Sequence, residues 1–255
     1  MQKKNKYIAI IPARYASTRF PGKPLALLGG RPIIERVYSR VAGAFDETVV
    51  ATDDERILSC VESFGGNCIM TSPNHQSGTD RCEEAYIKSN TDCNVVVNVQ
   101  GDEPFIHAEQ LVAVKKCFEN PDTEIATLVI PFNPDDGLLA LKNPNSPKVV
   151  VDKKGYALYF SRSVIPFLRN ESEEKWLEIH KFYKHIGLYA YRADVLRRIT
   201  KMEQTPLELC ESLEQLRWLE NGLTIKVAET RQKTIGIDTP EDLKRAEIFL
   251  KNQHY

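Results

Sequence analysis

A short loop near the amino end of the sequence concentrates the residue types that bind phosphate groups. Residues 12–24 carry three cations, two small hydroxyl residues and a glycine: Arg14, Arg19, Lys23, Ser17, Thr18 and Gly22. A polyphosphate requires fixed cations and accessible backbone N–H groups, with little side-chain bulk where the anion lies. The Walker sequence is absent. The pattern therefore indicates a phosphate-binding loop of another kind, and a solvated basic loop is the alternative.

Two aspartates stand at positions that leave a carboxylate free to bind a ligand. Asp102 follows a run of valines, and open α/β sheets bind ligands beyond the carboxyl ends of their strands. Asp238 precedes a predicted helix in which Thr239 is the N-cap and Pro240 the first residue. With Asp242 at the third position, this cap leaves the Asp238 carboxylate outside the helix. Carboxylate oxygens suit Mg²⁺. A plain turn at Asp102 and a cap at Asp238 are the alternative roles.

Further candidates lie in two groups along the chain. In the loop at 75–81, Gln76, Ser77 and Arg81 lead into a predicted helix, and an N-cap at Ser77 or Thr79 is the simplest account. The second half of the chain carries five more polar candidates: Arg162, His185, Tyr189, Glu214 and Gln215. Each of these five also has an ordinary structural explanation, such as a half-wet strand or a solvated helix face.

Alternating strand and helix patterns must position these residues. Short β-rich runs and amphipathic helix patterns alternate at 7–11, 32–41, 48–52, 57–64, 67–70, 94–99, 111–118 and 125–130. This alternation predicts an open, mostly parallel α/β sheet. Prolines interrupt the rhythm near residue 133. The remaining predictions are a hairpin at 148–160 that turns at Gly155, strands at 186–191 and 223–227, a helix at 213–219, and a last helix after Pro240.

Composition and charge restrict the class of protein. With 34 basic and 35 acidic residues, the net charge is −1, and no global field favours nucleic acid or an anionic membrane. Six cysteines without C-x-x-C spacing argue against a disulfide framework or a zinc site. The basic start resembles a signal peptide, but Pro12 and Arg14 end the apolar run too early. No stretch is long enough to insert into a membrane, and we expect a cytoplasmic protein.

The basic loop also carries a family resemblance. The sequence of residues 17–24, Ser-Thr-Arg-Phe-Pro-Gly-Lys-Pro, resembles the signature of sugar nucleotidyltransferases. Within that group it most resembles the 3-deoxy-manno-octulosonate cytidylyltransferase (CMP-Kdo synthetase) family. Six further segments match this family in order, at 75–81, 97–104, 156–162, 185–192, 213–217 and 236–241. The resemblance implies an open, mostly parallel, Rossmann-like sheet of the sugar nucleotidyltransferase type, with an inserted lobe for substrate and dimerisation.

The resemblance also implies an activity and a division of the chain. The expected enzyme transfers CMP from CTP to 3-deoxy-D-manno-octulosonate (Kdo) for lipopolysaccharide biosynthesis, uses Mg²⁺ and forms a homodimer. One domain over 1–255 is expected, in which 1–132 mainly bind nucleotide and 133–230 mainly bind sugar and dimerise. Residues 231–255 return to the core. We expect Phe167 and Trp176 to be exposed on the inserted lobe.

Each candidate residue receives a role from the resemblance. The expected nucleotide-binding residues are Ala13, Arg14, Ser17, Arg19, Lys23, Gln76, Ser77 and Arg81, of which Arg14, Arg19 and Lys23 act in catalysis together with Asp102. Arg81 is the candidate that recognises cytosine through its O2 and N3 acceptors. The expected sugar-binding residues are Gln100, Arg162, His185, Tyr189, Glu214 and Gln215, with Arg162 on the sugar carboxylate. Asp102 and Asp238 are the expected metal ligands.

Three alternatives stay open at this point. A sister cytidylyltransferase acts on sialic acid or 8-amino-Kdo, and the identity of the sugar acid separates it from the first hypothesis. A metal-dependent glycosyltransferase shares this kind of sheet but has no need of the cationic first loop. A catalytically inactive regulator binds CTP without releasing pyrophosphate, and the residues Lys23, Asp102 and Asp238 argue against it.

Overall fold

The computed structural model describes residues 4–252 and divides into two compact units. The first unit contains the described residues up to Val112 and from Lys233 onward, and the second runs from Ala113 to Gln232. The predicted functional division falls instead after residues 132 and 230, and the roles assigned to those segments stay a prediction. The basic start of the chain includes residues 1–3, which lie outside the described residues.

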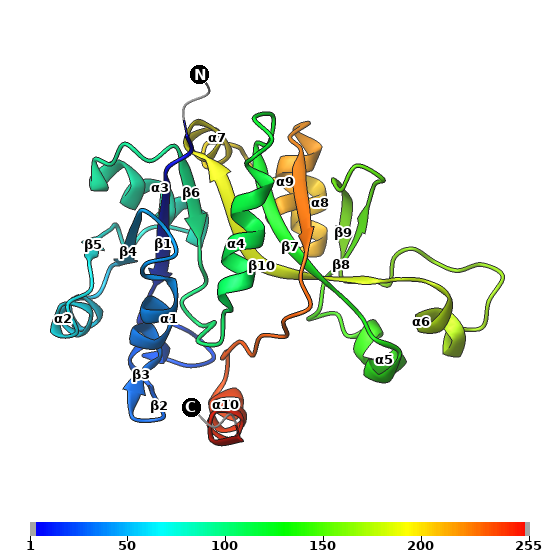
Figure 1. Ribbon diagram of the computed structural model, residues 1–255, viewed down its shortest axis with the longest axis horizontal. Helices are drawn as coiled ribbons and strands as arrows, with labels where there is room; N and C mark the ends of the chain where they lie inside the picture. The colour runs from blue at the N-terminus through cyan, green and yellow to red at the C-terminus, as the bar shows by residue number, and fades with distance from the viewer. Residues whose placement is uncertain (1–3, 253–255) are drawn as a thin grey trace. The chain divides into compact units, whose positions relative to one another are not determined.

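A parallel four-stranded sheet forms the centre of the first unit (Figure 1). Its strands, in spatial order, are β6 (Val95–Asn98), β1 (Tyr7–Ala13), β4 (Glu47–Thr52) and β5 (Cys68–Met70). Ile8, Ile10 and Ile11 of β1 are almost completely buried, as are the three valines of β6. Unbroken apolar runs are typical of parallel strands covered on both faces. The predicted mostly parallel α/β sheet is therefore confirmed.

Helices α1 (Ile33–Val41), α2 (Glu55–Ser63) and α3 (Gly78–Ser89) pack against this sheet. The first unit also contains α10 (Pro240–Asn252) and the start of α4 (Ala108–Cys117), which runs on into the second unit. A short hairpin, β2 (Leu27–Leu28) with β3 (Arg31–Pro32), precedes α1. The fully buried Ile33, Ile34 and Val37 form the apolar face of α1, spaced as an amphipathic helix requires. No helix within residues 4–252 combines the length and apolar character needed to cross a membrane.

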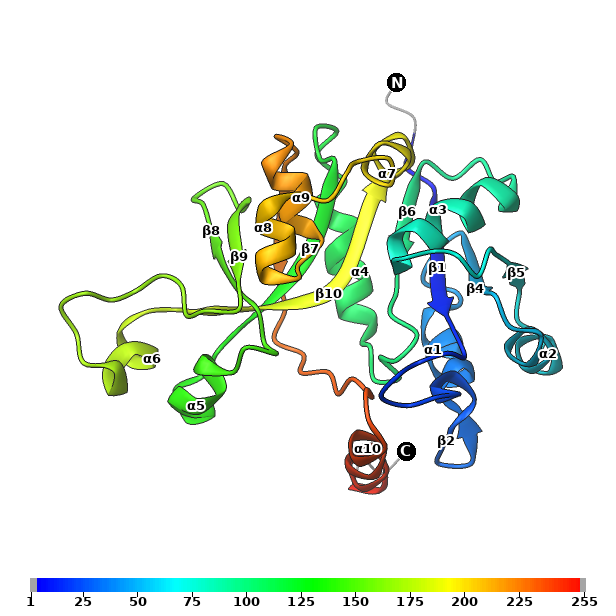
Figure 2. The ribbon, with the colours of Figure 1, turned by 180° about the vertical axis from the view of Figure 1, so that it is seen from behind.

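The second unit contains a mixed sheet and a hairpin (Figure 2). Strand β7 (Ile125–Pro131) pairs in parallel with β11 (Ile225–Glu229) and antiparallel with β10 (Tyr183–Arg192). The predicted hairpin is β8 (Lys148–Val151) with β9 (Ala157–Ser161), and Gly155 has a φ of 78° at its turn. Its helices are α5 (Gly137–Lys142), α6 (Trp176–Ile179), α7 (Ala193–Ile199), α8 (Pro206–Glu211) and α9 (Gln215–Glu220).

Two predictions for the second unit were wrong in part. The helix expected over 213–219 begins at Gln215, because Ser212 takes a left-handed conformation, with a φ of 50°, and ends a separate helix α8. Trp176 is not exposed: it is 2% accessible and packs against Leu141 and Phe182. Its indole N–H donates to a backbone carbonyl, which removes the cost of burying it. Phe167 is 71% exposed, as expected.

Candidate active site

The basic loop after β1 folds back on itself through a tight turn. Pro21 and Gly22 occupy the centre of this turn, in which the N–H of Lys23 donates to the carbonyl of Phe20 over 3.2 Å. Gly22 has a φ of 71° and a ψ of 12°, close to the third position of a type II turn, where glycine is favoured. Its N–H also donates to the carbonyl of Tyr15 over 2.9 Å. The Pro-Gly pair thus fixes the direction in which the Lys23 side chain leaves the loop.

The Lys23 ammonium lies between the two predicted metal ligands. Its Nζ is 2.6 Å from Oδ2 of Asp102 and 3.2 Å from Oδ1 of Asp238. The side chains of Lys23 and Asp102 are 14% and 27% exposed, so their contact is partly shielded from bulk water, whereas the Asp238 side chain is 47% exposed. Arg19 adds a second cation, 3.1 Å from the same oxygen of Asp238. Two cations and two carboxylates that are far apart in the sequence therefore form one cluster of ion pairs.

Backbone contacts hold the two aspartates together. The N–H of Ile237 donates to the carbonyl of Asp102 over 2.9 Å, and the Ile237 side chain is fully buried. Thr239 is the N-cap of α10: its Oγ1 accepts from the N–H of Asp242, whose carboxylate accepts in return from the N–H of Thr239. This confirms the predicted capping box, in which Thr239 caps the helix and the Asp238 carboxylate is left to Lys23 and Arg19.

A cavity of about 270 Å³ surrounds this charge cluster within the first unit. Every predicted nucleotide-binding residue lines it, and so do Gln100, Asp102 and Asp238; further lining residues include Pro12, His75, Gly78 and Gly101. Arg14 is exposed and forms no ion pair with any described residue, which leaves its guanidinium available to an anion. A Cβ on Gly101 would approach the carbonyl oxygen of Pro12 to 2.8 Å, so only glycine fits there.

Two of the predicted nucleotide contacts already have partners inside the protein. Ser77 caps α3, since its Oγ accepts from the N–H of Asp80 over 3.1 Å. The Arg81 guanidinium is almost completely buried and donates to Oγ1 of Thr71 over 2.6 Å and to Oδ2 of Asp53 over 3.0 Å. These contacts fix the plane of the guanidinium at the cavity wall. His75 and Gly101 were missed as individual residues, although both lie inside segments that carry the family resemblance.

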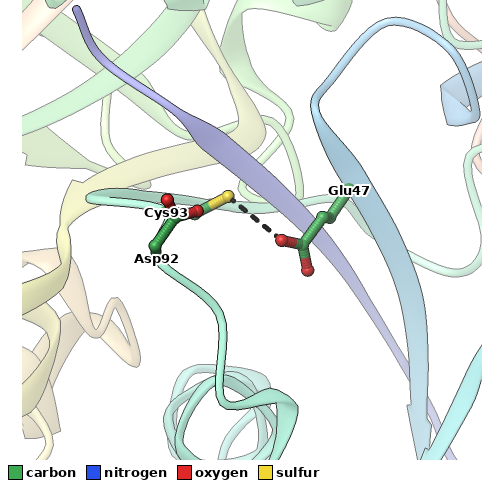
Figure 3. Close-up of side chains that lie close together, drawn as sticks. All are labelled: Glu47, Asp92 and Cys93. Carbon is green, nitrogen blue, oxygen red and sulfur yellow. Dashed lines mark hydrogen bonds between the residues drawn. The ribbon is translucent and has the colours of Figure 1, made fainter.

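Asp102 and Asp238 have the donor chemistry that Mg²⁺ requires. Both are carboxylates, and a cationic nitrogen already lies where their oxygens converge. A different group of possible ligands, Glu47, Asp92 and Cys93, lies within 4.8 Å (Figure 3). Asp92 accepts from Lys6 over 2.5 Å, and burial raises the pKa of the Cys93 thiol, which then stays protonated. The Cys93 thiol also lies 3.7 Å from the Glu47 carboxylate, so the members of this second group already contact protein groups.

The predicted sugar-binding residue Arg162 directly follows β9 in the second unit. Its guanidinium donates to three backbone carbonyls, through Nε to Glu211 over 2.6 Å, NH1 to Pro144 over 2.9 Å and NH2 to Ser212 over 3.1 Å. A guanidinium carries five N–H donors. Two donors are therefore left for another acceptor.

His185 and Tyr189 lie on β10 on either side of a β-bulge opposite Thr127. The buried Thr127 hydroxyl lies 2.9 Å from the carbonyl of Leu188 and 3.1 Å from Nε2 of His185, so it holds the imidazole beside the bulge. Burial lowers the pKa of His185 to about 3. Burial, followed by the charge of Glu214, raises the pKa of Tyr189 well above its ordinary value. Both side chains are neutral hydrogen-bonding groups at neutral pH.

Glu214 and Gln215 stand at the start of α9, where the predicted pair is partly buried. Gln215 is 5% exposed, and its Nε2 has no hydrogen-bond partner among residues 4–252. A buried amide without a partner costs free energy, so such groups in proteins commonly bind a ligand or water. The rings of Tyr189 and Trp218 meet edge to face at 5.2 Å, and Nε1 of Trp218 likewise lacks a partner in the described chain.

The depressed pKa of His185 gives a prediction for stability. The unfolded chain protonates this residue near pH 6.5, and the folded chain does so only near 3, so the unfolded state binds more protons between these values. The free energy of unfolding should therefore fall as the pH drops through this window, by at most about 1.4 kcal/mol per pH unit from this residue. Urea unfolding at several pH values should give a shallower dependence for His185→Gln. If the free energy of unfolding depends on pH equally in the two proteins, the lowered pKa of His185 is refuted.

Comparisons with known proteins identify the class to which this chain belongs. A family model described as "Cytidylyltransferase" matches residues 8–235. A solved 4-diphosphocytidyl-2C-methyl-D-erythritol synthase from Anaerococcus prevotii has a TM-score of 0.60 at 15% identity over 96% of this chain and 99% of its own, which shows the fold alone. The match and the cationic loop at the carboxyl end of β1 define the class of the protein as cytidylyltransferase.

Closer relatives narrow this class. The 3-deoxy-manno-octulosonate cytidylyltransferases of Phocaeicola vulgatus and Bacteroides thetaiotaomicron are 68% and 63% identical, each over 97% of this chain and 98% and 99% of their own. A structure described as CMP:2-keto-3-deoxy-manno-octonic acid synthetase complexed with CTP has a TM-score of 0.88 at 38% identity, covering 98% of this chain and 100% of its own. This chain belongs to the 3-deoxy-manno-octulosonate cytidylyltransferase family.

Proposed function

We propose that this protein transfers CMP from CTP to Kdo and releases pyrophosphate. The observation that carries the proposal is the convergence of Lys23, Asp102 and Asp238 in a cavity lined by the cationic loop. The name of the relative at 68% identity supports both the nucleotide and the sugar acid. CTP is further supported by the solved relative, which is described as a complex with CTP.

We assign the triphosphate to the cationic loop. Arg14, Arg19 and Lys23 supply three positive charges, and the turn at Gly22 fixes the path of the backbone beside them. Charge-assisted hydrogen bonds to phosphate are among the strong ones in proteins. The cytosine is assigned to the wall made by Gln76, Ser77 and Arg81, where the contacts of Arg81 with Asp53 and Thr71 hold its guanidinium in one orientation.

Asp102 and Asp238 would hold Mg²⁺, since both are carboxylates that already share one cation. When bound, the ion supplies positive charge to the α-phosphate and lowers the pKa of the attacking hydroxyl. The same two carboxylates orient Lys23 in the cavity. Gly101, between β6 and Asp102, brings this part of the chain close to the backbone at Pro12.

We assign the sugar acid to polar groups of the second unit. The unpartnered Nε2 of Gln215, the neutral imidazole of His185 and the phenol of Tyr189 are suited to sugar hydroxyls. Glu214 adds an acceptor, and the two remaining donors of Arg162 suit a carboxylate. Gln100 lines the cavity of the first unit, and its contact with the sugar stays a prediction.

The proposed reaction is an in-line displacement at phosphorus. The anomeric hydroxyl oxygen of Kdo bonds to the α-phosphorus of CTP, the bond to the β-phosphate breaks, and the hydroxyl proton passes to solvent. Pyrophosphate is the leaving group, and Lys23, Arg14 and Arg19 stabilise its charge. Such transfers depend on positioning and charge neutralisation more than on covalent help, so we assign no covalent enzyme intermediate.

One assay tests this function against its alternatives. Purified protein with CTP and Mg²⁺ should release pyrophosphate only when Kdo is added, and faster with Kdo than with 8-amino-Kdo or sialic acid at equal concentration. Faster release with either analogue would assign the protein to a sister activity. CTP binding without pyrophosphate release in the presence of any of the three acids would instead identify a regulator.

We further propose that the enzyme works in the cytoplasm as a homodimer. All six cysteines are within the described chain and are free thiols, which supports a reducing compartment. Leu158 of β9 and Leu209 of α8 are each 61% exposed, which supports an apolar contact surface on the second unit. Light scattering after size exclusion should give twice the mass of the 29.0 kDa chain. A monomer at micromolar concentration would contradict the dimer.

A further inference from the structure

The turn between α8 and α9 is tied to the end of β9 by the side chain of Glu211. We infer that Glu211 is a positioning residue: it holds Arg162 and the Glu214–Gln215 pair in a fixed arrangement, here called the polar frame, that binds the sugar acid. None of the roles predicted from the sequence includes Glu211. This inference rests on the proposed function, since it assigns a purpose to residues that the proposal places at the sugar. Every contact that supports it lies within the second unit.

Both oxygens of the Glu211 carboxylate are used to hold β9. Oε1 accepts from the hydroxyl of Ser161 over 2.6 Å, and Oε2 accepts from the backbone N–H of Arg162 over 2.9 Å. The Ser161 hydroxyl in turn accepts from the N–H of Ser163 over 3.0 Å. These contacts fix the backbone at the point where Arg162 leaves the strand.

The Arg162 guanidinium completes the connection in the opposite direction. Two of its nitrogens donate to the carbonyls of Glu211 and Ser212, and the third donates to the carbonyl of Pro144. Glu211 and Arg162 thus hold each other through the backbone and side chain of both residues. Since rotation of the guanidinium would break three hydrogen bonds, the direction of its two remaining donors is fixed.

The same contacts stabilise an unusual backbone conformation before α9. Ser212, whose carbonyl accepts from Arg162, has a φ of 50°, which is costly for a residue with a Cβ. A second contact connects the two helices on either side of Ser212: the guanidinium of Arg217 in α9 forms two hydrogen bonds of 2.8 Å with the buried carboxylate of Glu208 in α8. Only two residues separate Ser212 from Gln215, so the turn sets the direction of Glu214 and Gln215.

Positive charge gathers where Arg162 leaves β9. The fully buried Lys148 donates to the carbonyl of Arg162 over 2.5 Å, so its ammonium lies beside this network. Burial lowers the pKa of Lys148, and the charge of Glu211 opposes that shift. Lys148 and Arg162 supply two positive charges against the single carboxylate of Glu211. These three groups leave one positive charge in excess at the end of β9, although the frame as a whole is neutral, because Arg217 is balanced against Glu208 and Glu214 within α8 and α9. The local excess beside Arg162 suits the carboxylate of an anionic sugar.

Variants of Glu211 test this role with separate readings for the two substrates. Glu211→Ala should raise the KM for Kdo by roughly tenfold or more, because Arg162 and the Ser212 turn lose their fixed geometry. The Kd for CTP from calorimetry should stay within about twofold, since all residues that line the nucleotide cavity belong to the first unit. Glu211→Gln should recover most of the affinity, because its amide oxygen accepts from Arg162 and its NH2 donates to the rotatable Ser161 hydroxyl.

A matched control removes a similar contact from the same pair of helices. The carboxylate of Glu220 accepts from the N–H of Leu207 over 3.2 Å and touches none of the proposed sugar residues. Glu220→Ala should leave the KM for Kdo near that of the wild type. If Glu220→Ala raises this KM as much as Glu211→Ala does, the effect is a general loosening of α8 and α9, and the positioning role is wrong.

Three further outcomes decide the inference. A folded Glu211→Ala protein with an unchanged KM for Kdo would overturn it. If Glu211→Ala does not fold, Glu211→Asp replaces it, because the shorter side chain keeps the charge and cannot reach both Ser161 and Arg162. An unchanged KM for Kdo in Glu211→Asp would equally rule out the positioning role of Glu211. Failure of the wild-type protein to use Kdo would refute the proposed function itself, and it is recognised in the same assay before any variant is compared.

Discussion

Replacing Asp102 or Asp238 by asparagine is expected to lower kcat by about a hundredfold or more while the protein still folds. Each substitution removes one of the two carboxylates that converge at Lys23 and would hold Mg²⁺. Asparagine has nearly the same shape as aspartate, so the loss reports on charge. Pyrophosphate release at saturating CTP and Kdo, together with a thermal unfolding curve, measures the effect.

The affinity for CTP should not fall in the same variants, in contrast to their kcat. Without divalent cations, both asparagine variants should bind CTP no more weakly than the wild type, because each removes a negative charge near the triphosphate. Asp92→Asn is the matched control, since Asp92 is also a carboxylate paired with a lysine and belongs to the other possible ligand group. Its kcat should be unchanged. Full wild-type activity in excess chelator would rule out a metal role for either aspartate.

Lys23→Ala is expected to weaken CTP binding by about ten- to a hundredfold, the range that corresponds to losing one charged hydrogen bond of roughly 1.5–3 kcal/mol. The loss has two sources in the structure. The ammonium would no longer contact phosphate, and Asp102 and Asp238 would keep their negative charges without this partner. Turnover at saturating CTP should fall as well, because leaving pyrophosphate loses a cation.

Calorimetric titration of CTP beside sugar-dependent kinetics separates these effects. Lys6→Ala serves as the control, because Lys6 is another lysine of the first unit, is half exposed, and pairs with Asp92 outside the residues that line the nucleotide cavity. That variant should bind CTP normally. A Lys23→Ala protein that binds CTP like the wild type and has a raised KM only for Kdo would remove Lys23 from the phosphate site.

Local sequence was sufficient wherever neighbouring residues alone decide a conformation. The composition of residues 12–24 predicted a cationic loop with little side-chain bulk, and in the structure Gly22 allows the tight turn from which Lys23 leaves that loop. The segment from Asp238 to Asp242 predicted a capping box, and its hydrogen bonds are those expected. Parallel strands were also predictable, because short apolar runs alternate with helix patterns, as in sheets whose strands are buried on both faces.

Buried polar partners were beyond the reach of the sequence pattern. Nothing near Arg81 indicates that Asp53 and Thr71 hold its guanidinium, and nothing near Arg162 indicates that three carbonyls receive its donors. Trp176 was expected to be exposed on the inserted lobe, yet it packs beside Phe182. Such contacts join residues distant in the chain, and long polar or aromatic side chains reach many possible partners.

The sequence by itself determined the α/β class of this protein, the composition of its phosphate loop and the boundaries of most of its strands, because these follow from short-range periodicity and turn chemistry. Only the tertiary structure decided that Lys23 meets Asp102 and Asp238 at one point, since the contact requires the hydrogen bond between Ile237 and Asp102. It likewise decided that Ser212 separates α8 from α9. That left-handed turn depends on Arg162, some fifty positions earlier in the chain, for its stabilising hydrogen bond.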